Sequence, residues 1–405
     1  MLSENSRARG SAVGAPPPAG DRGLDVTLIL ALGTFAVGTD AFIVAGFLPA
    51  MAGDLDVSVA AAGQSVTAFA ITYAALAPVI ATVTAGVPRR RLLMVALLVL
   101  CAANVVAALA PTFALLLIGR ILSAVGAAAY TPTASAVSAS LVRPQLRARA
   151  LAVVIGGLTV ATALGVPLGN VLGGWLGWRG ALGLVAALCA VGAAGVVLLM
   201  PAVPGNPRVP LKARLAVLRR PAVTSVLSLT VFGMTASYTV YAYSVPAFES
   251  VGAGDAIPAV LFLYGLGAVA GNICSGYFTD RVGAVRVLTG AYLAMALGLG
   301  MLALLAAQEI SAAPLAIVLA AVWGAASWAQ TPPQQHRLIA EAPQEAPLVV
   351  SLNSSSIYLG IGAGTLLGGL FLPLGPPVVF GAGAAIALLS LGALGLSVDL
   401  GRKNS

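Results

Sequence analysis

The chain has 405 residues, of which 59% are hydrophobic and only 8% are charged. A globular soluble domain carries about 25% charged residues. The composition therefore excludes a soluble enzyme, a disordered chain and a nucleic-acid-binding protein. The formal charge of +8 at pH 7 would ordinarily suggest an acidic partner, but the placement of the basic residues gives a different reason, described below. We expect the protein to lie in a lipid bilayer and to bind no nucleic acid.

Cysteine and histidine are too few to build a disulfide framework or a histidine metal site. Cys101, Cys189 and Cys274 all lie in apolar runs without a CxxC pair, and such residues are typically small buried hydrophobes. His336 is the single histidine; we expect it to be a solvated loop residue at a helix end near Arg337. We expect neither a metal nor a cofactor.

The first 25 residues are polar, and they lack an apolar core followed by a small-residue cleavage site. We therefore predict a disordered cytoplasmic tail over 1–25 and no signal peptide. From Val26 onward the sequence breaks into twelve apolar runs of about 20 residues, the length at which a helix spans ~30 Å of hydrocarbon. The fold class is thus an all-α membrane protein, with spans predicted at 26–50, 60–86, 92–110, 113–141, 149–173, 179–200, 222–247, 256–279, 285–307, 313–333, 348–373 and 376–398.

The distribution of basic residues predicts the orientation of these spans. With the N-terminus inside, 19 of the 21 lysines and arginines fall in cytoplasmic segments; Arg179 lies outside and Arg120 lies within a helix. Both termini are then cytoplasmic, and the positive charge is a topology signal. The polar segment 201–221 separates six spans from six, which predicts two bundles, 26–200 and 222–398, a cytoplasmic linker between them and a short tail over 399–405.

Glycines recur at four-residue spacing in the fifth and eleventh predicted helices, which are six helices apart. The first set is Gly165, Gly169, Gly173 and Gly177, and the second is Gly360, Gly364 and Gly368. Four-residue spacing places glycines on one helical face, where two backbones can approach closely. The recurrence favours a parallel duplication, as in two-bundle transporters, and we expect Gly169 to lie where the bundles pack together. Simple helix packing is the other role of these glycines, and the two roles are compatible.

Asp40 is the only one of thirteen acids that lies deep inside a predicted span, and Arg120 lies at a similar depth in the fourth. A charge at mid-membrane costs at least ~2.5 kcal/mol, so an acid there is usually functional. We therefore predict that Asp40 and Arg120 form a proton-coupling pair. A conformational change that alters the burial of Asp40 or its distance from Arg120 would make it bind and release a proton. The alternative is a static pair that only fixes helix packing.

Aromatic and amide side chains within the spans predict a substrate cavity. Ligand pockets are mostly apolar and contain a few well-placed polar groups, so this set suits an uncharged or weakly polar aromatic molecule. Helix packing is the alternative role of each residue, but Asn272 and Asn353 rank higher because a buried amide needs partners. The candidates are Phe42, Tyr73, Tyr130, Tyr238, Tyr241, Asn272, Trp323, Asn353 and Tyr358.

The segment 276–286, at the end of the eighth predicted helix, resembles the G-x(3)-D-R-x-G-x-x-R signature of the major facilitator superfamily. The resemblance implies that its five matching residues belong to a conformational switch: Gly276, Asp280, Arg281, Gly283 and Arg286. In the equivalent loop of the first half, Ala85 stands where the acid is usual, and only the basic run Arg89–Arg91 remains. The usual Asp–Arg latch is therefore missing there.

Further stretches resemble the drug–proton antiporter branch of that superfamily. Gly119–Gly126 is similar to its R-x-x-x-G element, although Ser123 and Ala124 stand where a glutamine is common. The stretch 165–179, which includes Pro167, looks like its antiporter motif. With 38–49 and 351–360, these stretches resemble chloramphenicol-resistance and arabinose-efflux exporters. The resemblance implies a major facilitator fold in the inner membrane and export of a small hydrophobic, uncharged antibiotic such as a phenicol in exchange for protons; we expect a monomer.

Three other functions are compatible with parts of the sequence. Sugar or metabolite efflux is a rival because arabinose-efflux relatives share the motifs. An intramembrane enzyme would need a Ser/His or paired-Asp constellation within the spans, and the single histidine and lone deep acid argue against one. A non-transporting membrane receptor is the third. The sequence contains no GxxxxGK[ST] nucleotide-binding motif, so we expect the proton gradient, not ATP, to drive transport.

Overall fold

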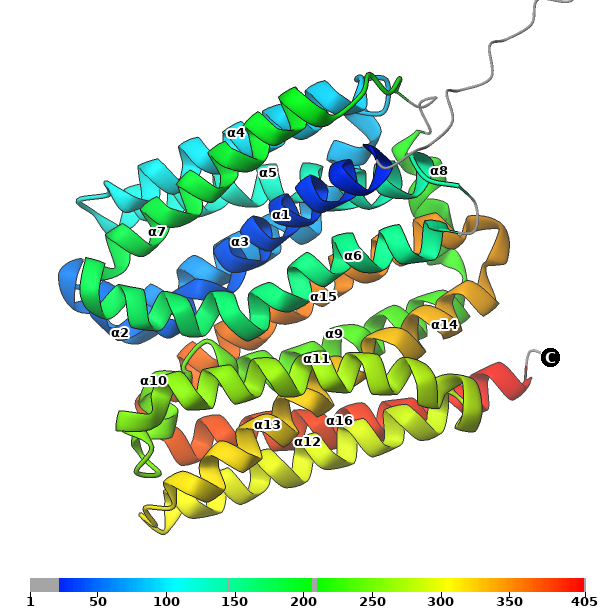
Figure 1. Ribbon diagram of the computed structural model, residues 1–405. Coiled ribbons are helices and arrows are strands. Elements are labelled where there is room, and N and C mark those ends of the chain that lie inside the picture. The colour runs from blue at the N-terminus through cyan, green and yellow to red at the C-terminus, as the bar shows by residue number, and fades with distance from the viewer. Residues whose placement is uncertain (1–21, 144–145, 206–209, 404–405) are drawn as a thin grey trace, which may run out of the picture.

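In the computed structural model, the described residues are 22–143, 146–205 and 210–403 (Figure 1). Every regular element within these ranges is a helix. Most of the predicted tail 1–25 lies outside the described residues, and its last four residues already belong to the first helix. The predicted tail at 399–405 is also shorter than expected, because the last helix continues to Lys403.

The first half of the chain contains helices α1 to α7. Their bounds are α1 Arg22–Phe42, η1 Ile43–Gly46, α2 Leu48–Asp54, α3 Val59–Val83, α4 Arg89–Ala108, α5 Phe113–Ser140, α6 Arg147–Val160, η3 Ala161–Gly165 and α7 Val166–Leu199. The segment η1 is a 3₁₀-helix and η3 is a single π-helical turn inside the longer helix formed by α6 and α7.

The second half contains α9 to α16, and the segment before it contains a short helix, α8, and a 3₁₀ turn, η4. Their bounds are α8 Leu211–Leu215, η4 Ala216–Arg219, α9 Pro221–Tyr241, α10 Ser244–Glu249, η5 Gly254–Ala256, α11 Ile257–Val282, α12 Ala284–Ala307, α13 Ala313–Ala329, α14 Thr331–Glu341, η6 Pro343–Glu345, α15 Ala346–Phe371, η7 Leu372–Leu374 and α16 Pro376–Lys403.

Eleven helical stretches of the described chain are long and apolar enough to cross a membrane. One of them, Arg149–Leu199, has 51 residues, and by length alone contains two spans. Gly177 divides it, because its φ of +71° is non-helical and turns the chain back on itself. The predicted twelve-helix, all-α fold is therefore confirmed.

Two predicted segment ends were wrong. The first span was predicted over 26–50, but the α-helix ends at Phe42, the chain tightens into η1, and α2 begins at Leu48 with Pro49 in its first turn. The tenth span was predicted to end at 333, but α13 is followed directly by α14, which runs to Glu341. His336 is therefore an exposed residue within a helix, not a loop residue.

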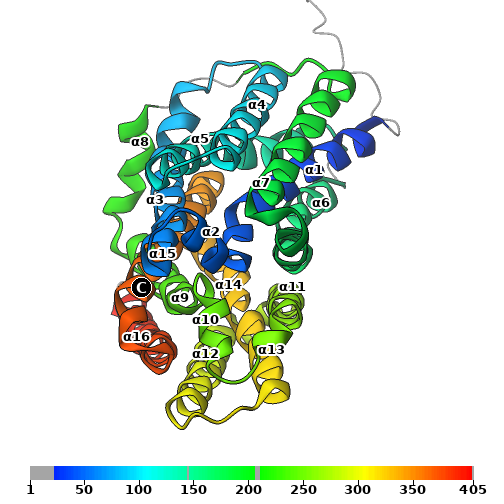
Figure 2. The same ribbon diagram turned by 90° about the vertical axis from the view of Figure 1, so that its left-hand side faces the viewer.

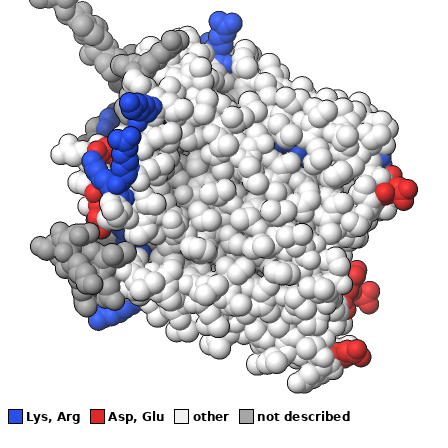
Figure 3. Space-filling view, turned by 180° about the vertical axis from the view of Figure 1, so that it is seen from behind, with Lys and Arg blue, Asp and Glu red and all other residues white. Residues whose placement is uncertain are grey.

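The helices form two groups that lie side by side, α1 to α7 above and α9 to α16 below in Figure 2. The groups meet mainly where α3 packs on α15 and where η3 and α7 pack on α11. Lysine and arginine gather at the end of the molecule where α8 and the end of α16 lie, which we call the basic end. The opposite end, which contains α2 and α10, presents aspartate and glutamate, and the surface between them is largely uncharged (Figure 3).

Candidate functional site

Asp40, Arg120 and Ser123 form a buried cluster between α1 and α5. Arg120 Nη1 lies 2.6 Å from Asp40 Oδ1, and the Ser123 hydroxyl donates to Asp40 Oδ2 at 2.6 Å. Arg120 Nη2 also donates to the Asp40 main-chain carbonyl at 3.0 Å. The three side chains are at most 1% exposed. The predicted pairing of Asp40 with Arg120 is thus present, with direct contacts.

The local sequence explains how this cluster is built. Arg120 and Ser123 are three residues apart on α5, so both face the same neighbouring helix. The Phe69 ring, on α3, lies 4.6 Å from the Arg120 guanidinium carbon and provides a cation–π contact. In the sequence, Ser123 stands out only as a departure from a motif, but its spacing of three residues from Arg120 is the signal that it can reach the same acid.

The donors around Asp40 pair both oxygens of its carboxylate. Both carboxylate oxygens accept a hydrogen bond, so the ionised form is fully satisfied here. The Arg120 Nε has no hydrogen-bond partner among the described residues. A buried charge that loses its partner is strongly destabilised. A rearrangement that separates α1 from α5 would therefore leave two buried charges unpaired.

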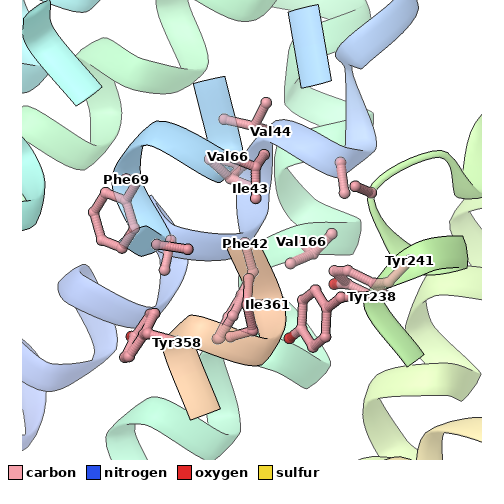
Figure 4. Packing of buried hydrophobic residues seen from close by; sticks show 14 of the residues in the cluster. Phe42, Ile43, Val44, Val66, Phe69, Val166, Tyr238, Tyr241, Tyr358 and Ile361 are labelled. Carbon is pink, nitrogen blue, oxygen red and sulfur yellow. The ribbon is translucent and has the colours of Figure 1, made fainter. Parts of the chain in front are cut away.

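An aromatic cluster lies beside this pair and contains residues of both halves (Figure 4). Tyr73 of α3 stacks on Tyr358 of α15 with 3.8 Å between ring centroids. Phe42, two residues after Asp40, contacts Tyr238 of α9 and Trp328 of α13, each at 6.2 Å between centroids. Four predicted substrate residues are therefore brought together where the halves meet: Phe42, Tyr73, Tyr238 and Tyr358.

Two other candidates lie deeper in the second half. The Trp323 indole donates to the Ser237 hydroxyl at 3.0 Å, and Ser327 donates to the same oxygen at 2.7 Å. Tyr241 packs against Tyr264 with 4.7 Å between centroids, and Trp323 packs against Tyr264 at 4.5 Å. Tyr241 continues the aromatic cluster through Tyr238 at 5.1 Å, and it also contacts Trp323 with 6.2 Å between centroids. Both candidates therefore extend the cluster into the second half.

The remaining three candidates are not brought to this cluster by any described contact. The Tyr130 hydroxyl donates to the Leu30 carbonyl at 3.2 Å, within the first half. Asn353 Oδ1 accepts from Thr230 at 2.9 Å, within the second half, and its Nδ2 has no partner among the described residues. Asn272 is half-buried on α11. Their contacts fit helix packing.

The glycine stripe of the fifth span packs inside the first half. A Cβ atom at Gly165 would lie 2.6 Å from the Thr39 hydroxyl, and one at Gly169 would collide with the Ile43 side chain. Gly173 faces Phe47, so successive glycines oppose residues four apart, from Thr39 on α1 through Ile43 on η1 to Phe47 directly after η1. The expectation that Gly169 lies between the bundles was wrong, because four-residue spacing defines a face but not the helix opposite.

The second stripe repeats this arrangement in the second half. A Cβ atom at Gly360 would lie 2.6 Å from Met234 Cβ, and one at Gly364 would lie 2.6 Å from the Thr235 carbonyl oxygen. Gly368 closes against the Thr239 carbonyl. The stripe therefore packs α15 on α9 as the first stripe packs α7 on α1. The same helix packing thus occurs in both halves, as expected for the duplication predicted from the sequence.

The motif at 276–286 forms the turn between α11 and α12 at the basic end. Gly283 has a φ of +88°, which favours glycine, and it ends α11. The Arg281 guanidinium lies over the Tyr277 ring at 4.1 Å, while Asp280 and Arg286 are exposed. Among the described residues, Asp280 takes part in none of the three ion pairs.

Pro167 is buried in the first turn of α7, directly after η3.

Comparisons with known proteins agree on one family. The family model described as Major Facilitator Superfamily matches residues 30–343 and 227–403. The inner membrane transport protein YdhP of Escherichia coli (strain K12) is 33% identical, over 89% of this chain and 94% of that protein. A protein named chloramphenicol resistance protein, from Streptomyces lividans, is also 33% identical over 89% of this chain and 94% of its own.

A solved structure shares the fold at low sequence identity. It is that of a bacterial homologue of the human lysosomal transporter Spinster, in an inward-facing and unoccupied conformation. The match covers 95% of this chain and 96% of the other, with a TM-score of 0.69 and 19% identity. It supports the twelve-helix architecture alone.

Proposed function

The chain belongs to the Major Facilitator Superfamily, and on that premise we propose that it exports a small hydrophobic, uncharged antibiotic, such as a phenicol, in exchange for protons. One observation carries this proposal. The buried Asp40–Arg120–Ser123 cluster lies two residues from Phe42, whose ring contacts aromatic residues of the other half. A change of protonation at Asp40 is therefore close to a surface that must rearrange when the halves move.

The substrate class follows from the side chains at that surface. Phe42, Tyr73, Tyr238 and Tyr358 offer ring faces and few polar atoms, which fits an uncharged aromatic molecule better than a sugar with many hydroxyls. Asp40 already has partners for both carboxylate oxygens, so it is not a free anion for a cationic drug. The relative named for chloramphenicol resistance supports the same choice.

Alternating access gives the proposal its mechanism. The two glycine stripes pack α7 closely on α1 and α15 closely on α9, so the helices of each pair would move together. We propose that the halves, 26–200 and 222–398, rock against each other along the α3–α15 and η3–α11 contacts. We further propose that the basic end is cytoplasmic, as positive charges near spans favour, which places both termini on that side of the inner membrane.

Transport in proteoliposomes tests this proposal. We expect chloramphenicol added to vesicles that contain the protein to move protons in the opposite direction. Asp40→Asn should abolish uphill transport, because an amide keeps the shape of the side chain but cannot ionise. Asp255→Asn, at an exposed acid of the opposite end, serves as the matched control and should transport normally.

Two outcomes would reject the proposal. Arabinose-driven proton flux without a chloramphenicol response would assign the protein to sugar efflux. Full uphill transport by Asp40→Asn that a protonophore still collapses would place proton coupling at another residue.

A further inference from the structure

Tyr243 of the second half lies against a glycine of the first half, near the end of the molecule that contains α2 and α10. It stands in the short break between α9 and α10, and its side chain is fully buried. A Cβ atom added at Gly63, on α3, would collide with the Tyr243 hydroxyl oxygen and would lie 2.7 Å from two of its ring carbons. The ring can therefore occupy this place only because residue 63 has no side chain.

The second half holds the same ring through α15. The Tyr243 hydroxyl donates to the Thr365 carbonyl at 3.0 Å. A Cβ atom at Gly369 would lie 2.5 Å from the hydroxyl oxygen, and one at Gly368 would lie 2.8 Å from two ring carbons. The ring thus fills a space that glycines of α3 and α15 leave between them. Moving it away from Gly63 would break its hydrogen bond or press it on α15.

The contact between the halves changes along α3 and α15. On the side of Tyr243 it is close: a Cβ atom at Gly369 would lie 2.8 Å from Gln64 Nε2, and one at Gly362 would lie 2.8 Å from Ile71 Cγ1. At the same end, α10 packs on η1 and α2 of the first half (Figure 2). Towards the basic end, α3 and α15 instead line a groove of about 340 Å³. Leucines of α8 and η4 also line this groove: Leu211, Leu215 and Leu218. The halves are therefore closed at the end of α2 and α10 and are separated by a groove towards the basic end.

We infer that Tyr243 is a positioning residue of the transport cycle: its contact with Gly63 holds the halves together at the end of α2 and α10, and this contact separates when that end opens. The inference rests on the alternating access proposed above, in which the halves must part at one end as they close at the other. Tyr243 suits this role because its hydrogen bond to Thr365 ties it to the second half, whereas Gly63 moves with the first.

The distance between two spin labels tests the inference without substrate or proton flux. The labels replace Leu109, on the turn between α4 and α5, and Gln308, on the turn between α12 and α13; both residues are exposed at the end of α2 and α10. Distances are measured by double electron–electron resonance on the full chain in lipid nanodiscs. We expect a short distance to dominate in this background, in which alanine replaces the native cysteines: Cys101, Cys189 and Cys274.

Two variants should open this end. Gly63→Ala pushes the Tyr243 ring out of its place and should raise the share of longer distances at least fivefold. Tyr243→Phe keeps the ring but loses the bond to Thr365, and should raise the ratio of longer to shorter distances about fivefold, the effect of losing one hydrogen bond. Gly63→Ala combined with Tyr243→Leu should open the end less than Gly63→Ala alone, because leucine lacks the ring atoms that the new methyl group meets.

Gly53→Ala is the matched control, since Gly53 lies on α2 at the same end and an added Cβ atom would meet nothing within 4 Å. Its distances should equal those of the wild type. Unchanged distances in Gly63→Ala would overturn the inference, even with a lower melting temperature, because a ring that serves packing alone affects stability and not the opening of this end. If Gly63→Ala does not fold, unchanged distances in Tyr243→Phe would overturn it instead. The distances are read without transport, so a failure of antibiotic export in the wild type is detected separately.

Discussion

The two halves of this protein use one helical framework but join their inner helices by different chemistry. In the first half, α1 is joined to α5 by the charged contact of Asp40 with Arg120 and Ser123. In the second half, α9 is joined to α13 by neutral hydrogen bonds from Trp323 and Ser327 to Ser237. In both halves a glycine stripe packs one further helix closely against the first helix of that half: α7 against α1, and α15 against α9.

We call these two contacts, that of α1 with α5 and that of α9 with α13, the joints of the two halves. The first joint contains a pair of ionisable side chains, and the second contains only neutral ones. A buried ion pair is costly to keep and costly to break, and it responds to protonation because one partner can lose its charge. Hydrogen bonds between an indole and two hydroxyls contain no group that titrates near neutral pH. We therefore propose that proton coupling lies in the first half, and we expect the second half to hold its shape through the cycle.

The largest effect expected from this comparison is on transport by variants of the two joints. Arg120→Lys keeps the charge but cannot contact both Asp40 Oδ1 and the Asp40 carbonyl with a planar fork, so we expect export to fall by more than tenfold. Ser237→Ala removes an uncharged hub and should keep export near the wild-type rate once expression is matched. The initial rate of export from proteoliposomes measures both. Loss of export in Ser237→Ala with a normal melting temperature would remove the distinction between the joints.

The next effect is on stability, where the two glycine stripes differ. A Cβ at Gly364 would press on a main-chain carbonyl of α9, which cannot move aside, whereas one at Gly169 would press on the Ile43 side chain, which can rotate. We expect Gly364→Ala to destabilise the protein by ~1–3 kcal/mol and Gly169→Ala to cost less. Thermal unfolding in detergent tests this order.

Gly173→Ala is the matched control for both stripe variants. Its added Cβ would lie 3.6 Å from Phe47 Cβ, an ordinary contact distance, so its melting temperature should stay close to that of the wild type. A drop as large as that of Gly364→Ala would show that the loss comes from the glycine backbone itself and not from the closeness of α9.

A smaller effect is expected from the two serines that donate within the joints. Ser123→Ala leaves Asp40 Oδ2 without its donor, and we expect export to fall by about tenfold, the lower end of the ~1.5–3 kcal/mol that a hydrogen bond to a charged group contributes. Ser327→Ala removes a donor from Ser237, which still receives the Trp323 indole hydrogen, and should leave the export rate unchanged. Export rates at matched expression check both variants, and equal losses would contradict the assignment.

The sequence was sufficient to predict the features that lipid imposes and insufficient for those that packing decides. Twelve apolar runs give twelve helices because the bilayer leaves the backbone no other choice, and Asp40 and Arg120 stand out because charges are rare there. The partner of Gly169 and the contacts of Trp323 depend on which helices become neighbours. Residue spacing defines a helix face, but it does not say which helix packs against that face. The end of α14 was missed because a polar stretch such as Gln334–Arg337 continues the helix beyond the apolar run.

The smallest effect concerns an exposed ion pair at the opposite end of the first half, a contrast to the buried pair. Asp54 accepts from the Trp178 indole at 2.9 Å and pairs with Arg179, across the turn that Gly177 makes. The hydrogen bonds from Trp178 and Arg179 lower the pKa of Asp54. A lowered pKa in the folded state stabilises the fold at pH values above the unfolded value of about 3.9. That stabilisation is lost as the pH falls through the folded pKa.

We therefore expect wild type to melt slightly above Asp54→Asn at pH 6–7, and the two to converge as the solution is acidified below about pH 4. Both partners are about half exposed, so water and salt screen the pair and the difference should shrink at high ionic strength. Asp56→Asn is the control, since Asp56 lies two residues after Asp54 and joins none of the ion pairs among the described residues. A melting difference that persists unchanged at low pH would mean that Asp54 acts through packing against Trp178, because only a charge effect disappears when the carboxylate is protonated.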